Sequence, residues 1–237
     1  MIDNISSNRT LAPTAARRNQ QAKSTLSTQT ANTVRSIAMD TWTRKSTVSV
    51  PASAKAIEKY KVPAICQFDP DPTLDDKGYT NASANCGPTS MAMVARAFGY
   101  GAGMTNAQLI NHMGKIGGTT RAGSSDESIV RMAKSIGKHA VVKGPKPDVS
   151  WIASELRAGK LVVVHGNFLA LPHEEDLAKT RYAAGHFMLV VGINSSGDFL
   201  VHDPGDNAYL ERTLTPKELA DFIEDPHYHR GSQIAIG

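Results

Sequence analysis

The chain has 237 residues, of which 41% are hydrophobic, a content typical of a soluble globular protein of one or two domains. No apolar run is long enough for a transmembrane helix and the N-terminus lacks an apolar h-region, so we expect neither a membrane span nor a classical signal peptide. Seven Lys/Arg and two Asp in residues 1–50 give that segment +5, which leaves −1 of the net +4 for the remainder and argues against nucleic-acid binding. Two cysteines do not make a disulfide framework, which indicates a reducing compartment.

Residues 1–50 are rich in Ser, Thr, Asn and Gln and poor in acidic residues. Such a segment buries too little apolar surface to offset its ordering entropy, so we predict a disordered or weakly structured leader followed by a folded catalytic domain over 51–237. Its composition resembles bacterial type III secretion signals and organellar transit peptides. One hypothesis is therefore a delivery segment, on a protein that starts in the bacterial cytoplasm and is secreted or translocated into a target cell; the alternative is an unstructured terminus without a role.

The first half of the domain is predicted to be helical. Residues 60–72 indicate a strand or an extended arm that ends in Asp-Pro turns. A helix is expected just after Cys86, because Pro88 lacks the amide hydrogen that the first helical turn does not use, and to end at Gly99. Two further helices are predicted, one capped by Thr105 over Gln108–Met113 and one capped by Ser125 or Asp126 and ended by Gly137.

The second half changes to strands. A β-branched run at 161–168 predicts a buried strand, and 186–193 with 199–204 predicts an antiparallel hairpin around the turn NSSGD. The other expected elements are strands at 139–142 and 233–237, helices at 149–158 and 215–222, and a loop or short helix at 169–184. Helices first and antiparallel strands after them predict an α+β fold.

Cys86 stands at the N-terminal end of the first predicted helix. The positive end of a helix dipole, together with a nearby imidazolium, lowers the pKa of a thiol enough to make the nucleophilic thiolate abundant. Apolar residues at helical spacing from Met91 to Phe98 bury one face of this helix and fix the cysteine at its tip. The alternative is an ordinary buried cysteine. The decision between them depends on partner residues elsewhere in the chain.

A thiolate nucleophile needs a base, a group that orients the base, and donors for an oxyanion. His186 begins a hydrophobic strand and Asp203 ends its hairpin partner, so closure of the hairpin brings the two side chains near each other. Asp203 could then hold the imidazole tautomer. Gln67, on the entering arm, carries an amide that could bind a developing oxyanion together with the backbone amide of Cys86.

Other residues provide alternatives for these roles. Asp206 and Asn167 are the alternative orienting groups if the hairpin register is shifted. Cys66 is predicted to be a small buried residue beside Gln67. A disulfide between Cys66 and Cys86, which would silence the enzyme, is the less favoured alternative.

The remaining histidines do not indicate a metal site. His202 is expected to pack against neighbours or to face solvent. His227 and His229 form an HxH pair without further ligands at fixed spacing, so we expect neither a metal nor another cofactor.

The combination of Gln67, 85-NCGPTSMAMVARAFG-99, 185-GHFMLVVGI-193 and 202-HDP-204 resembles the papain-like cysteine peptidases of the C39 and C39-like group. The resemblance covers about residues 60–236. It implies a papain-like fold, with an N-terminal helical half packed on an antiparallel β-sheet half. It also implies Cys86 as nucleophile, His186 as general base and acid, Asp203 as orienting residue and Gln67 as oxyanion donor. The chain has no transporter portion, so the free-standing, effector- or toxin-type members resemble it more.

The function implied by this resemblance is a cysteine protease that acts on a protein or peptide substrate, as a secreted bacterial effector or toxin in a target cell. An immunity protein or a secretion chaperone is a candidate partner. Two alternatives remain open. One is a papain-like amidase or transpeptidase that acts on peptidoglycan or γ-glutamyl peptides, and the other is a non-catalytic binding module that keeps the fold.

Overall fold

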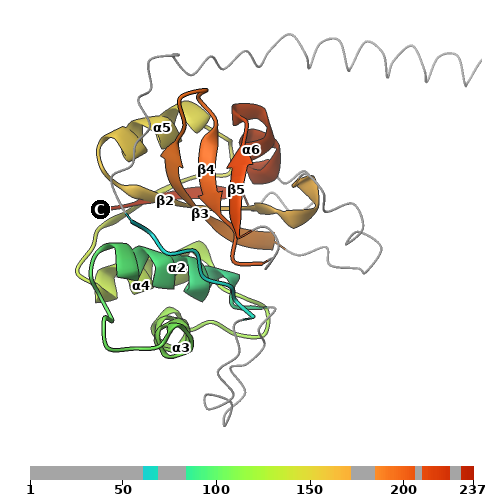
Figure 1. Cartoon of the computed structure of the whole chain (residues 1–237). Helices are drawn as coiled ribbons and strands as arrows, with labels where there is room; N and C mark the ends of the chain where they lie inside the picture. Colours follow the sequence, from blue (N-terminus) through green and yellow to red (C-terminus); the bar gives the residue numbers. More distant parts are fainter. Residues whose placement is uncertain (1–60, 69–83, 172–184, 206–209, 225–230) are drawn as a thin grey trace, which may run out of the picture. The chain divides into compact units, whose positions relative to one another are not determined.

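A six-stranded antiparallel sheet divides the described residues into two helical layers. The computed structural model describes residues 61–68, 84–171, 185–205, 210–224 and 231–237. The predicted leader and the predicted domain boundary after residue 50 lie outside these residues. Figure 1 shows helices α2, α3 and α4 on one side of the sheet and α5 and α6 on the other.

The described chain starts with three helices, and strands with interspersed helices follow. In chain order they are α2 Cys86–Ala97, α3 Asn106–Gly117, α4 Asp126–Ser135, β1 Ala140–Lys143, α5 Val149–Arg157, β2 Leu161–Asn167, the 3₁₀ turn η3 Phe168–Ala170, β3 Gly185–Ile193, β4 Phe199–His202, β5 Glu211–Leu214, α6 Pro216–Ile223 and β6 Ser232–Ile236. None of the helices in the described ranges has the length and apolar character that crossing a membrane requires.

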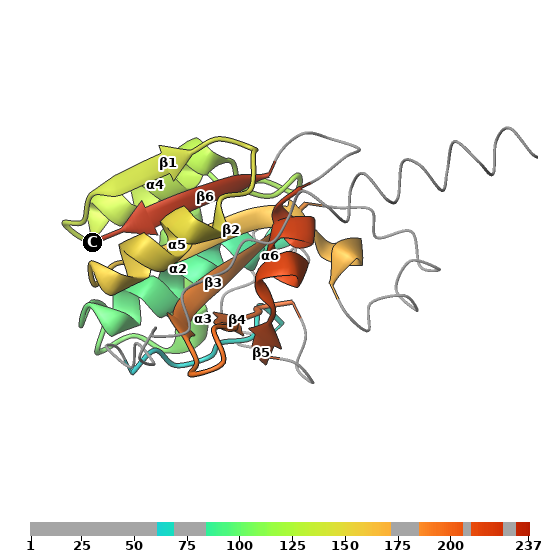
Figure 2. The ribbon, with the colours of Figure 1, turned by 90° about the horizontal axis from the view of Figure 1, so that it is seen from above.

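The strands lie in the order β1-β6-β2-β3-β4-β5, and each neighbouring pair is antiparallel. Consecutive hairpins join β2 to β5, whereas the last strand, β6, inserts between β1 and β2 (Figure 2). The last strand therefore joins the edge strand β1 to β2, which pairs in turn with the strand that carries His186.

The central strands β2 and β3 are buried on both faces, and each places alternate side chains on opposite faces of the sheet. On β2, Leu161 and Val163 pack with α2, α3 and α4, while Val162 and Val164 pack with α5 and α6. Strand β3 alternates in the same way. This explains why the central strands are continuous apolar runs rather than alternating patterns.

The predicted α+β class is confirmed, and the helix caps fall where the sequence indicates. Thr105 and Ser125 both form capping boxes, at α3 and α4. Helix α2 begins at Cys86 itself, before the expected start. Pro88 occupies its third position, where a missing N–H still leaves no helical hydrogen bond unmade. Residues 61–66 form no helix or strand, so the strand that was one of the two predictions for residues 60–72 is absent from the described part of that segment.

Strand β5 was not expected from the sequence. Its four residues, ERTL, are alternately exposed and buried, with Arg212 and Leu214 facing inward. The strand pairs with β4 along its whole length, from Phe199 opposite Leu214 to His202 opposite Glu211. An arginine at an inward position interrupts the apolar alternation that marks a strand of this length.

A substitution at Gly166 on β2 can test the packing between the sheet and α6. A Cβ atom at this position would lie 2.0 Å from the carbonyl oxygen of Phe222, and this backbone atom can move only with the helix. We expect Gly166→Ala to lower the free energy of unfolding by about 1–3 kcal/mol or more. The matched control is Gly144→Ala, where nothing lies within 4 Å and the change should be within about 1 kcal/mol. Urea unfolding of both variants measures the difference, and equal midpoints would contradict this packing.

Candidate active site

Cys86 is the first residue of α2 and is buried. The helix is fixed against β3 by Ser90, whose Oγ donates to the carbonyl oxygen of Phe187 at 3.3 Å. The side chain of Cys86 belongs to the hydrophobic cluster between the sheet and helices α2, α3 and α4. The thiol is thus held next to the first residues of β3.

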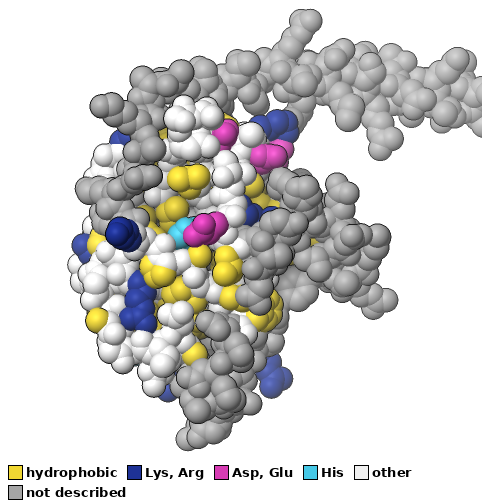
Figure 3. Space-filling model, viewed as in Figure 1, with side chains coloured by type: hydrophobic (Ala, Val, Ile, Leu, Met, Phe, Trp, Pro, Cys, Tyr) yellow, Lys and Arg dark blue, Asp and Glu magenta, His cyan; other side chains and the backbone are white. Residues whose placement is uncertain are grey.

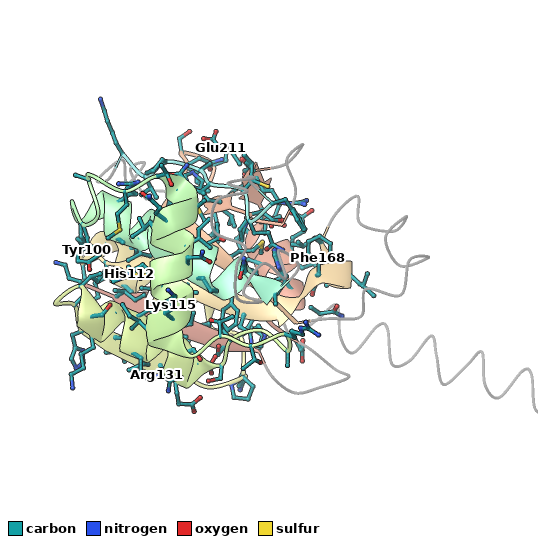
Figure 4. All side chains as sticks on the ribbon, turned by 90° about the horizontal axis from the view of Figure 1, so that it is seen from below. Tyr100, His112, Lys115, Arg131, Phe168 and Glu211 are labelled. Carbon is teal, nitrogen blue, oxygen red and sulfur yellow. The ribbon has the colours of Figure 1, made fainter. Side chains whose placement is uncertain are left out.

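His186 lies near the start of β3, where that strand extends beyond its pairing with β4. The first pair between these strands is Leu189 with His202. The imidazole meets the ring of Phe168 edge-on, with 4.8 Å between ring centroids. Phe168 lies in η3, directly after β2 (Figure 4). Since Nε2 of His186 lies 2.7 Å from Oδ1 of Asp203, Nδ1 is the ring nitrogen that remains for Cys86.

Asp203 follows β4 and has no exposed surface. Its Oδ1 accepts from the backbone N–H of Gly205 at 2.8 Å in addition to His186. Its Oδ2 accepts from Nε of Arg212 at 2.7 Å. A carboxylate bonded by three donors is held in one orientation, and the imidazole that it contacts is held with it.

The ionisation of the three groups is coupled. Burial of the thiol favours its neutral form, but the hydrogen bond and charge of His186, with backbone hydrogen bonds at Phe187 and Gly87, outweigh burial and lower the pKa of Cys86. Burial also disfavours the imidazolium, yet the charge and hydrogen bond of Asp203, and then those of Cys86, raise the pKa of His186 to about 10. The site therefore favours a thiolate–imidazolium pair.

Asp203 stays ionised in this environment. Burial raises the pKa of the carboxyl group, but His186, Arg212 and the N–H of Gly205 outweigh it and hold the pKa below its usual value.

Gly205 is also sterically required. A Cβ atom there would lie 2.9 Å from Cε1 of His186 and 3.2 Å from Oδ1 of Asp203. The loop after β4 can approach the ring this closely only without a side chain at that position.

Gln67 is buried and lies next to the same loop. Its backbone N–H donates to the carbonyl oxygen of Pro204 at 2.9 Å. Ile65, two residues earlier, packs in the same hydrophobic cluster as Cys86. The arm thus brings Gln67 to the part of the structure that holds Asp203, while its role as oxyanion donor stays a prediction.

The alternative residues have other positions. Asn167 accepts from the backbone N–H of Leu169 at 3.0 Å and so caps η3. Asp206 lies outside the described residues. Cys66 and Cys86 are both buried thiols and do not form the disulfide that was the less favoured alternative. The orienting position beside His186 is therefore occupied by Asp203.

His202 is buried and lies opposite Glu211. The histidines of the HxH pair, His227 and His229, lie outside the described residues. Over the ranges that the structure describes, no group of three or more His, Cys, Asp or Glu side chains is placed to bind a metal ion.

Three residues of this site were not found from the sequence: Phe168, Gly205 and Arg212. Phe168 was assigned to the end of the predicted strand 161–168, and Gly205 lies just beyond the predicted strand 199–204. The available signal for Arg212 was the alternation in ERTL, which places the arginine and Leu214 on the same inward face. A charged residue at an inward position needs a buried partner of opposite charge, but both Asp203 and Asp206 precede this strand, so the sequence alone does not select between them.

The amino-acid sequence matches the model of the Peptidase C39 like family over residues 59–233, a range that includes Gln67, Cys86, His186 and Asp203. No curated protein matches the chain.

Several solved structures are similar to this chain. One is the peptidase domain of Streptococcus ComA, a bifunctional ABC transporter. It has a TM-score of 0.46 and 17% sequence identity, and the match covers 65% of this chain and 90% of that chain. A protein described as a C39-like peptidase from Bacillus anthracis has TM-score 0.49 and 16% identity over 74% and 94% of the two chains. A double-glycine-motif protease from an AMS/PCAT transporter has a TM-score of 0.45 and 17% sequence identity, and the match covers 75% of this chain and 90% of that chain.

The coupling between Cys86 and His186 predicts how the thiol reacts with pH. Below its lowered pKa the thiol is protonated and unreactive, so the rate of alkylation by iodoacetamide should rise through a midpoint below that of an ordinary thiol. In His186→Ala the hydrogen bond and charge of the imidazole, the largest lowering contributions, are lost while burial remains, so the midpoint should rise. Mass spectrometry of the Cys86 peptide measures the rate of alkylation. Alkylation of Cys66, which is buried in the folded chain, shows whether the variant has unfolded in the same sample. An unchanged midpoint in a folded variant would refute the coupling.

Proposed function

The chain belongs to the peptidase C39-like family of cysteine peptidases, and we propose that it hydrolyses peptide bonds of a protein substrate through a triad of Cys86, His186 and Asp203. The observation that supports this most directly is the contact between His186 and a fully buried Asp203, on the opposite side of the ring from the thiol. A histidine held in this way can take and return a proton without losing its orientation.

The proposed reaction has two stages. The Cys86 thiolate attacks the carbonyl carbon of the scissile bond, and the oxyanion that forms is bound by the Gln67 amide and the backbone amide of Cys86. His186 then donates its proton to the leaving nitrogen, the C–N bond breaks and an acyl-enzyme remains. In the second stage His186 takes a proton from water, the hydroxide attacks the thioester, and the acid product and the thiolate are released.

The face of the molecule seen in Figure 3 does not favour a nucleic acid as the substrate. On the face seen in Figure 3, Lys and Arg side chains lie as separate groups, and hydrophobic side chains occupy much of the middle. A surface that binds a nucleic acid needs a continuous basic stripe. The described side chains visible on this face do not form such a stripe.

The cellular context belongs to the same proposal. The polar, acid-poor composition of residues 1–50 supports a protein made in the bacterial cytoplasm and delivered into a target cell as an effector or toxin. A protein that cleaves other proteins endangers the cell that makes it. This supports an immunity protein or a secretion chaperone as a partner before delivery.

Comparison of Cys86→Ala with the unmodified chain tests the proposed activity. Incubation of each with a cell lysate, followed by proteomic identification of new N-termini, should give termini that depend on Cys86. Cys66→Ala is the matched control and should keep the cleavage pattern, since the lost thiol is not the nucleophile. A parallel incubation with cell-wall sacculi examines the amidase alternative. Identical termini with and without Cys86, or products only from sacculi, would refute the protease proposal.

Gln67 can be tested separately from the triad. Removal of one oxyanion donor typically lowers kcat by about 10²–10³, because the donor acts mainly on the transition state. We therefore expect Gln67→Ala to lower kcat by about 10² with a smaller change in KM, and Gln67→Glu, which places a carboxylate at the same site, to be at least as slow. Steady-state kinetics on a cleaved peptide measures both constants. A loss confined to KM would show that Gln67 contacts substrate but not the oxyanion.

A further inference from the structure

The triad is extended by a fourth charged side chain. We propose that Arg212 is a positioning residue for the reaction: it holds the Asp203 carboxylate charged and aligned, and thereby keeps Cys86 and His186 as a thiolate–imidazolium pair. This inference rests on the proposed function, in which Cys86 is the nucleophile. Arg212 itself contacts Asp203 and acts on the thiol only through the two residues between them.

The sheet register brings Arg212 to Asp203. Arg212 on β5 is paired with Val201 on β4, and Asp203 follows two residues after Val201 on the same face. The N–H of Asp203 donates to the carbonyl oxygen of Leu210 at 2.9 Å, so the alignment of the two segments continues past the last strand pair. Residues diagonal to each other across two strands are within reach of a long side chain. The guanidinium Nε accordingly lies 2.7 Å from Oδ2 of Asp203.

Four charges of alternating sign then form a buried row. The thiolate of Cys86 contacts the imidazolium of His186, which contacts the carboxylate of Asp203, which contacts the guanidinium of Arg212. All four residues are buried, and Asp203 has no exposed surface. The four charges sum to zero. Burial of a net charge is far more costly than burial of a neutral set, because water no longer solvates it.

Loss of the Arg212 charge would leave the other three groups with a sum of −1. The row can return to neutrality by binding one proton, at the thiolate of Cys86 or at the carboxylate of Asp203. Protonation at either site slows the reaction, since a neutral thiol does not attack the substrate and a neutral carboxyl group no longer stabilises the imidazolium. Arg212 therefore favours the reactive protonation state.

In the described part of the chain, the other charged or titratable groups on the surrounding elements contact other residues or face solvent. His202 and Glu211 lie opposite each other on β4 and β5, with Nε2 and Oε1 3.9 Å apart, and 77% of the Glu211 side chain is exposed. Figure 4 shows Glu211 at the rim, apart from Phe168. His165 on β2 stacks on Phe187. Two further groups lie on the packed helices: the exposed pair Lys217 and Asp221 on α6, and Arg96 in the last turn of α2.

The test separates the charge of Arg212 from its hydrogen bond. Arg212→Gln removes the charge and keeps an N–H donor for Asp203, while Arg212→Lys keeps the charge and loses the planar guanidinium. The readout is the pH midpoint for iodoacetamide alkylation of Cys86. Trypsin cleavage after Lys61, Lys77 and Arg96 places the two cysteines in separate peptides, residues 62–77 and 78–96. Rapid alkylation of buried Cys66 therefore identifies any variant that has unfolded.

In Arg212→Gln we expect the midpoint to rise by about one pH unit or more, which corresponds to about tenfold less thiolate at any pH below the midpoint. In Arg212→Lys we expect the midpoint to stay near that of the unmodified chain. In the Asp203→Asn background the change Arg212→Gln should move the midpoint little, because the charge that Arg212 acts through is already absent. Arg212→Met serves as the neutral variant if Arg212→Gln does not fold.

Two results would overturn the inference. One is a folded neutral variant with an unchanged midpoint, and the other is an equal shift with and without Asp203. Both are distinct from failure of the proposed function, which would appear in the unmodified chain as a Cys86 midpoint no lower than that of an ordinary thiol. A role of Arg212 in folding alone would lower stability and leave the midpoint in place.

Discussion

A carboxylate without contact to water is the constraint on which the rest of the site depends. Asp203 can remain charged in the interior only if hydrogen-bond donors surround it. These donors are the ring of His186 on β3, the backbone N–H of Gly205, which is two residues after Asp203, and the guanidinium of Arg212 on β5. Each donor requires a feature of the fold. The ring requires β3 to extend past β4, the loop requires a glycine, and the guanidinium requires the short strand β5.

The site forms at one end of β3, where His186 contacts a residue from each of the two hydrophobic clusters. Cys86 belongs to the hydrophobic cluster between the sheet and α2, α3 and α4, whereas Phe168 belongs to the cluster between the sheet and α5 and α6. His186 contacts both, at the end of the central strand β3. Cys86 and Phe168, which contact the same imidazole, thus come from opposite faces of the sheet. Close packing of both clusters keeps their spacing constant.

Cys86, His186 and Asp203 could be predicted because each lies at the end of an element with a strong local signal, and hairpin pairing of two apolar strands implies the contact between the last two. Arg212 could not be predicted in the same way, since its partner lies across a strand boundary in a segment whose alternation of charged and apolar residues is weak. The start of α2 was placed too late because a proline in the first turn fits several positions equally well. Gln67 was named from its side-chain chemistry, and the structure adds the backbone contact with Pro204.

Stability alone does not account for the buried row of charges. Replacement of buried ion pairs by apolar residues of similar volume is often neutral or stabilising, because desolvation offsets much of the Coulomb attraction. Four ionisable side chains from α2, β3, the loop after β4 and β5 are therefore a costly way to hold two layers together. Under the proposed function, the arrangement does what an apolar core cannot do, which is to favour an ionised thiol and a protonated imidazole away from water. The short strand β5 and the glycine after Pro204 are the features at this end of the sheet that this proposal explains.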